Sequence, residues 1–222
     1  MKFFKVSPIK AGLALAATLG AALLALAQQP APAAAATQLK IKTMPKPGKQ
    51  LLVQTPDFQI RGATPRALSR GKPRDWAVID VDYETKTPQK VGWVDNVSAT
   101  FYVLTETTTP ERTKEFSFYS LTVRYMNVPD GEHRAGVVLA PSTLERYGSI
   151  VAIACEITAD GAAAPVTQSE HTAPELNANK DDWWKNPKIT DSPITKKRDG
   201  LLLERSKTPF GLINMDDYEA VR

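Results

Sequence analysis

The sequence has 222 residues, of which 42% are hydrophobic and 23% charged, and its formal net charge is +4. A single cysteine cannot form an intramolecular disulfide, and one cysteine with two histidines leaves no room for a Cys/His zinc cage. The plentiful hydrophobic residues and small net charge also argue against a disordered chain.

Residues 1–27 have the three-part pattern of a secretory signal peptide. Three lysines precede a run of alanine and leucine that contains no acid and ends in Ala-Leu-Ala at residues 25–27. A second small-residue site lies at residues 34–36, so we expect cleavage after residue 27 or after residue 36. An uncleaved membrane anchor is the alternative, but the run is short for a bilayer and rich in alanine. The pattern predicts a secreted protein, in the periplasm or on the outer cell surface.

Removal of residues 1–36 would take away three lysines and lower the net charge from +4 to +1, which weakens the case for a nucleic-acid partner. The remaining charge is uneven. Nine basic residues against one acid give residues 37–74 a net +8, whereas seven basic against thirteen acidic residues give residues 75–160 a net −6. The basic segment either lies on acidic surface of its own domain or contacts an anionic surface, such as phospholipid headgroups or an envelope polymer. Its candidate contact residues are Arg61, Arg66, Arg70, Lys72 and Arg74.

Hydrophobic periodicity predicts strands for most of the chain after a Pro/Ala/Lys-rich stretch at residues 28–50, which we interpret as a linker. In residues 76–84 apolar residues alternate with acidic ones, as in a strand with one buried face. Two short strands are expected at residues 51–53 and 58–61. Longer strands are expected at residues 93–105, 116–128, 135–140 and 150–158.

The connections between these strands are short. Residues 106–111 predict a long hairpin loop, and Pro-Asp-Gly at 129–131 predicts a turn. The capping-box pattern from Ser142 to Glu145 predicts a helical turn that ends at Gly148.

These elements predict an all-β fold, an antiparallel immunoglobulin-like sandwich over residues 51–161 with one short helical turn. Residues 162–222 are interpreted as an extended C-terminal tail that docks on this sandwich. Two returning strands are expected in the tail, at residues 201–205 and 210–215.

Few side chains are suited to catalysis. His133 and His171 are the only possible bases of a hydrolytic triad, and since neither lies in a catalytic motif we expect both at the surface. Cys155 alternates with aliphatic residues, which predicts a buried inert thiol, with an intermolecular disulfide as the alternative. The three carboxylates of Asp80, Asp82 and Glu84 are interpreted as a solvated strand face rather than a calcium site, because no glycine-hinged loop accompanies them. We therefore expect no enzyme activity, no cofactor and no metal.

Trp183 and Trp184 are the most suggestive binding residues. Neighbours in an extended segment point to opposite sides, so both cannot enter one core. We favour the interpretation that these tryptophans only anchor the tail. In the alternative, one anchors the tail while the other contacts a partner, a sugar ring or a membrane interface.

The strand pattern between residues 76 and 158 resembles an immunoglobulin-like sandwich. It departs from antibody-type domains because Cys155 has no partner and Tyr147 is followed by Gly148 and Ser149 rather than by a cysteine two positions on. With the alanine-rich leader and the Lys/Pro linker, the sequence Trp-Val-Asp-Asn-Val-Ser-Ala-Thr-Phe-Tyr-Val-Leu at residues 93–104 is similar to secreted immunoglobulin-like proteins associated with type IV pilus gene clusters of Verrucomicrobia.

This resemblance implies a role in pilus formation or surface attachment. A major pilin would need a glutamate at the fifth mature position of a long hydrophobic helix, and no acid occurs before Asp57, so an accessory component fits better. Two functions stay open. One is a non-enzymatic envelope protein that contacts envelope or pilus proteins through a sheet edge or the basic segment. The other is a glycan-binding sandwich that uses exposed tryptophans.

The signal-peptide interpretation predicts where the exported protein begins. N-terminal sequencing of the protein recovered outside the cytosol is expected to start at Gln28 or Thr37, because each follows a small-residue cleavage site. A product that still begins at Met1 would contradict this interpretation and favour a membrane anchor.

Overall fold

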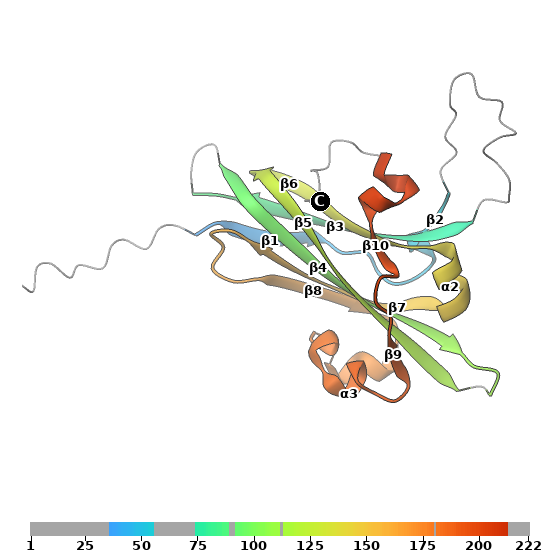
Figure 1. The fold of residues 1–222 in the computed structure, drawn as a ribbon. Coiled ribbons are helices and arrows are strands. Elements are labelled where there is room, and N and C mark those ends of the chain that lie inside the picture. Colours follow the sequence, from blue (N-terminus) through green and yellow to red (C-terminus); the bar gives the residue numbers. More distant parts are fainter. Residues whose placement is uncertain (1–35, 56–73, 89–91, 112, 180, 213–222) are drawn as a thin grey trace, which may run out of the picture. The chain divides into compact units, whose positions relative to one another are not determined.

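The computed structural model describes residues 36–55, 74–88, 92–111, 113–179 and 181–212. They form a sandwich of two β-sheets (Figure 1), which confirms the all-β prediction. The expected signal peptide, the strand expected at residues 58–61, and Arg61, Arg66, Arg70 and Lys72 lie outside the described residues. Among the described helices, none has the length and hydrophobicity needed to span a bilayer.

Among the described residues, each sheet contains five strands. The first sheet runs in the order β1–β3–β6–β10, and β2 also pairs with β3; its strands are β1 (Gln38–Thr43), β2 (Leu52–Gln54), β3 (Asp75–Lys86), β6 (Gly131–Leu139) and β10 (Leu202–Glu204). The second sheet contains, in spatial order, β8 (Val166–His171), β7 (Ser149–Ala159), β4 (Trp93–Thr108), β5 (Lys114–Pro129) and β9 (Thr195–Lys197). The pairs of described strands are antiparallel except for β5 with β9.

The main core lies between the two sheets and follows the predicted alternation. In β3 the apolar residues at alternate positions are fully buried: Ala77, Ile79, Val81 and Tyr83. From the second sheet, Phe101, Val103, Ile153 and Ile157 pack into the same core. Burying one such aliphatic or aromatic side chain is worth roughly 1.5–3 kcal/mol, so this alternation accounts for much of the stability of the fold.

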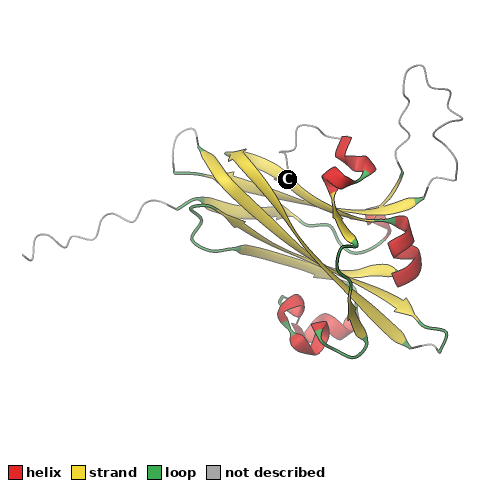
Figure 2. Cartoon of the chain, in the orientation of Figure 1, coloured by secondary structure: helices red, strands yellow, loops and turns green. Residues whose placement is uncertain are grey.

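A second core covers the outer face of the second sheet. Leu104, Phe118 and Ala152 point away from the first sheet and pack against Trp183 and Trp184. The covering segment consists of η3 (Pro174–Asn179), η4 (Trp183–Lys185) and α3 (Pro187–Thr190). Figure 2 shows these short helices beyond the second sheet, so part of the molecule has three layers.

The sandwich includes more of the chain than the sequence indicated. Residues 38–43 were expected to belong to a linker, yet they form β1, which pairs with β3 along the edge of the first sheet. Leu39 and Ile41 of β1 pack on the core while Lys40 is exposed. This alternation is only two apolar residues long, so it is a weak signal among the surrounding lysines and prolines. β8 and β9 also have too weak a signal to be predicted. β8 is mostly polar, so it lacks an apolar alternation, and β9 has only three residues.

Two further expectations were wrong. The β4–β5 hairpin loop is shorter than expected, because the threonines that precede it continue the pairing to Thr108 opposite Lys114. Threonine is β-branched and favours extended backbone, which explains the longer strands. Phe210 lies in η6 (Pro209–Leu212) rather than in a strand, and its ring packs edge-on against Trp76 with 5.8 Å between centroids. Residues 213–215 lie outside the described residues.

The predicted helical turn is present as α2 (Pro141–Tyr147), and it ends at Gly148 as expected. The capping box is not formed. The N-cap residue is Ala140, which has no side-chain cap, and Pro141 occupies the first helical position, where its missing N–H costs no hydrogen bond. Glu145 points instead to Arg74.

Gly148 should tolerate no side chain. Its φ of 85° favours glycine, and an added Cβ would overlap the backbone oxygen of Glu106. We expect Gly148→Ala to lower the free energy of unfolding by roughly 3 kcal/mol or more, measured by urea titration with circular dichroism. The control is Gly200→Ala, which has a φ of 74° but open space around the Cβ position, and should cost about 1 kcal/mol. Equal losses for the two variants would contradict the proposed contact.

Candidate functional site

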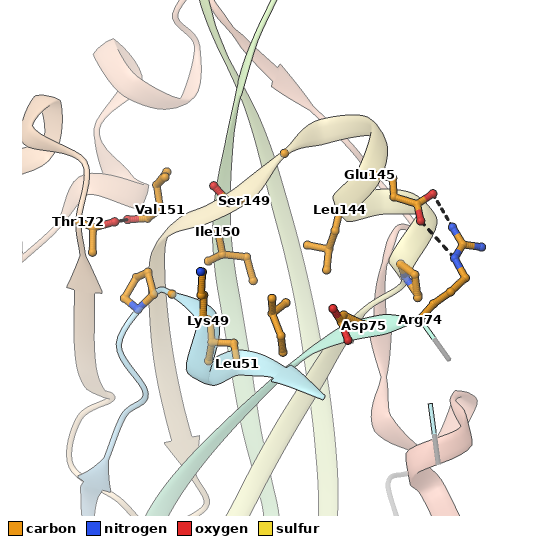
Figure 3. A pocket seen from close by; sticks show the side chains of 15 residues that line it. Lys49, Leu51, Arg74, Asp75, Leu144, Glu145, Ser149, Ile150, Val151 and Thr172 are labelled. Atoms are coloured by element: carbon orange, nitrogen blue, oxygen red, sulfur yellow. Dashed lines mark hydrogen bonds and ion pairs between the residues drawn. The ribbon is translucent and has the colours of Figure 1, made fainter. Parts of the chain in front are cut away.

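A cavity of about 860 Å³ lies at one end of the sandwich, where α2, β2, β3 and β7 meet (Figure 3). Its apolar lining includes Leu51 and Leu52 near β2, Leu144 of α2, and Ile150 of β7. Cavities of this size accommodate a small molecule or several side chains of a peptide. The cavity brings together segments that are about a hundred residues apart along the chain.

Charged residues form the rim of this cavity. The guanidinium of Arg74 donates to both carboxylate oxygens of Glu145, with Nε–Oε1 at 3.2 Å and Nη2–Oε2 at 2.5 Å (Figure 3). This pairing lowers the pKa of the Glu145 carboxyl and raises the pKa of Arg74, so both stay charged at neutral pH. Lys49 and Asp75 also lie at the rim, and neither makes an ion pair with any of the described residues.

The basic segment partly lies on acids of its own domain. Arg74, a predicted contact residue, is exposed but is held by Glu145. Lys42 lies 2.9 Å from Glu84 and 3.4 Å from Glu132, and these carboxylates raise its pKa. For these two residues the structure therefore favours pairing within the domain.

The row of carboxylates on β3 meets a row of bases. Lys42 pairs with Glu84, and Asp82 accepts from Arg134 Nε at 2.7 Å. Asp80 lies 3.5 Å from the Nη1 of Arg205, in η5 (Arg205–Lys207). The row therefore joins β3 to its neighbours. Within the described ranges, no group of three or more His, Cys, Asp or Glu side chains could hold a metal ion.

Trp183 and Trp184 both anchor the tail, which agrees with the favoured interpretation, whereas the alternative in which one of them contacts a partner was wrong. Both are buried, because the 3-10 helix η4 turns the chain so that neighbouring side chains need not point to opposite faces. Their rings meet edge-on at 5.9 Å, and Trp184 stacks on Tyr102 at 5.9 Å. Trp183 packs edge-on against Phe118 at 6.2 Å. Glycan binding through exposed tryptophans at this position therefore has no structural basis.

The prediction that His133 lies at the surface was also wrong. His133 is buried beside the turn between β5 and β6, where its Nε2 lies 2.7 Å from the carbonyl oxygen of Pro129 and 3.1 Å from Thr85 Oγ1. A carbonyl oxygen only accepts, so Nε2 carries the proton and donates it. His133 therefore fastens the turn to β3. His171 is half-buried at the end of β8, so only part of its side chain lies at the surface.

The prediction of a buried thiol at Cys155 is confirmed. Cys155 is fully buried in the core between the sheets, opposite Phe101 of β4. Burial raises the pKa of the thiol well above its ordinary value, because a thiolate would be poorly solvated there. The folded protein cannot use this thiol for a disulfide between chains.

Sequence reasoning missed the exposed apolar residues and the cavity. Trp93 is 59% exposed and Met126 46% exposed on the outer face of the second sheet, and Leu52 and Val53 of β2 are each 42% exposed. The strand pattern gives the side of Trp93, but whether that side is covered depends on the tertiary structure. The cavity has no local signal at all.

Comparison with known proteins places the chain in a family. A family model matches residues 32–222 of the chain. The chain belongs to this family. A crystal structure of a protein from Akkermansia muciniphila is similar, with a TM-score of 0.63 and 24% sequence identity over 84% of this chain and 95% of that chain. At this identity the likeness shows a shared fold. A search of curated proteins gave no match.

The buried tryptophans should be essential for stability. We expect Trp183→Ala to lower the free energy of unfolding by roughly 3–5 kcal/mol, because it empties the second core. Trp93→Ala is the matched control and should change stability by less than about 0.5 kcal/mol, since its side chain is mostly exposed. Chemical denaturation followed by tryptophan fluorescence and circular dichroism measures both. Similar losses for the two variants would contradict this assignment.

Proposed function

We propose that this protein is a non-enzymatic, secreted component of the cell envelope that acts through protein–protein contacts. More specifically, the protein is an accessory component of type IV pilus formation or surface attachment. The secretory pattern of residues 1–27 and the sequence resemblance to pilus-associated immunoglobulin-like proteins support it. The structural match is to a protein of Akkermansia, which belongs to the Verrucomicrobia, the same group as the pilus-associated proteins that the sequence resembles.

The observation that carries the proposal is apolar surface on the sandwich. Trp93 and Met126 are exposed on the outer face of the second sheet. Farther along the same two strands this face is polar, with the hydroxyls of Thr100 and Thr122 hydrogen-bonded at 2.9 Å. An exposed tryptophan offers a large contact area at low cost in side-chain entropy, and tryptophan is enriched among the residues that dominate protein interfaces. Such surface suits binding to another protein.

The polar side chains of the described residues support the same proposal. His133 bonds to the backbone of a turn, Cys155 is buried, and the carboxylates of β3 pair with bases. These groups contribute to the fold and are not presented in the cavity. Since these polar groups serve the fold while apolar residues are exposed, the described residues favour binding to a partner over conversion of a substrate.

The proposal is tested by cross-linking in intact cells of the source bacterium. Affinity-tagged protein is purified after cross-linking, and we expect mass spectrometry to identify pilus or outer-envelope proteins at several-fold higher abundance than with Trp93→Ala. The matched control is Thr100→Ala, which alters the same face without removing apolar area and should retain the partners.

Two results together would contradict the proposal. They are recovery of the cross-linked protein without partners, and a deletion strain whose pili and surface attachment equal those of the parent.

A further inference from the structure

The edge of the first sheet is protected at β1 but not at β2. Both strands pair with the same side of β3. Edge strands are commonly blunted by lysine, as β1 is by Lys40 and Lys42, because an unpaired row of backbone groups invites another strand. In β2 the corresponding surface is apolar, since Leu52 and Val53 are each 42% exposed. Among the described strands β2 pairs only with β3, and no other described strand lies along its outer edge.

The cavity adjoins this edge on one face of β2. Leu52 lines it together with Leu51, Leu144 and Ile150, which form an apolar surface from three different parts of the fold (Figure 3). Val53 does not line it, because successive side chains of a strand point to opposite faces. A strand placed beside β2 would therefore direct every second side chain towards this apolar surface.

Opposite charges stand at the two ends of β2. Lys49 precedes the strand by three residues, and Asp75 is the cross-strand partner of Gln54, the last residue of β2. Both lie at the rim of the cavity and are exposed, and neither pairs with an ionised group in the described part of the chain. A ligand complementary to this edge carries a negative charge at the Lys49 end and a positive charge at the Asp75 end.

We propose that this edge binds an extended peptide segment of a partner protein, which adds a strand beside β2. Its apolar side chains at alternate positions enter the cavity, an acidic residue meets Lys49 and a basic residue meets Asp75. In this mode of recognition main-chain hydrogen bonds supply affinity, and the pocket selects the side chains. The inference rests on the proposed function, because it names the surface for one of its protein contacts. An acyl chain would fit the apolar lining but would leave Asp75 without a counter-charge.

The test uses the exported protein and a fluorescein-labelled decapeptide that alternates valine and threonine between a terminal glutamate and a terminal lysine. Fluorescence anisotropy is expected to show saturable binding. Leu52→Asp should weaken binding at least tenfold, because it places a charge beside the apolar lining. Val53→Asp is the matched control, with the same exposure on the same strand but outside the cavity, and should weaken binding less than threefold. Circular dichroism checks that both variants remain folded.

Further measurements distinguish a peptide that adds a strand from a small amphipathic ligand in the cavity. A peptide with the same side chains but methylated backbone nitrogens at alternate positions should bind at least tenfold more weakly, and equal binding would overturn strand addition. Lys49→Glu should weaken binding of the acidic-end peptide several-fold, and no effect would overturn the charge match. Binding of anilinonaphthalene sulfonate to the cavity without binding of the peptide would also overturn the inference, in favour of a small amphipathic ligand.

The failure of this inference differs from failure of the proposed function. If Leu52→Asp still cross-links to the same envelope partners in cells as the parent protein, the β2 edge is not the contact surface, whereas the proposed function stands. If the parent protein has no partners, the proposed function itself fails.

Discussion

Burial of both faces of the second sheet is the constraint on which the rest of this structure depends. The inner face of β7 contributes Ile153 and Cys155 to the core between the sheets, while the outer face contributes Ala152 and Ala154 to the second core. Alanine at these outer positions leaves room for large aromatic rings to approach the sheet. The C-terminal segment supplies those rings, and it is therefore a structural layer of the domain rather than an appended tail.

Several polar side chains among the described residues stabilise connections between elements of the domain. His133 ties the β5–β6 turn to β3, and the carboxylate of Asp130 accepts from the backbone N–H of Thr87 at 2.7 Å and from its hydroxyl at 3.1 Å. The acidic row of β3 pairs with bases on both sides of the strand. Because these pairs are partly exposed, each adds little stability.

The polar side chains named above serve the fold, whereas two apolar features lie on the surface of the described residues. Trp93 presents an aromatic ring on a polar sheet face, and β2 presents an apolar edge beside a cavity, with charges at its ends that pair with no ionised group of the described residues. Both features suit contact with another protein, and they lie on different sheets. A sandwich that contacts partners at two such places fits an accessory component of an envelope assembly, which is the function proposed for this family member.

The sequence by itself determined the long strands, the end of α2 at Gly148 and the burial of Cys155, because each depends on local periodicity or on one backbone conformation. Only the tertiary structure decided the burial of His133, which depends on Thr85, 48 positions away. It also decided that both Trp183 and Trp184 are buried, because they lie in a turn of 3-10 helix rather than in extended backbone. The cavity beside β2 likewise arises where distant segments meet, and alternation within one strand carries no information about which segment will lie opposite.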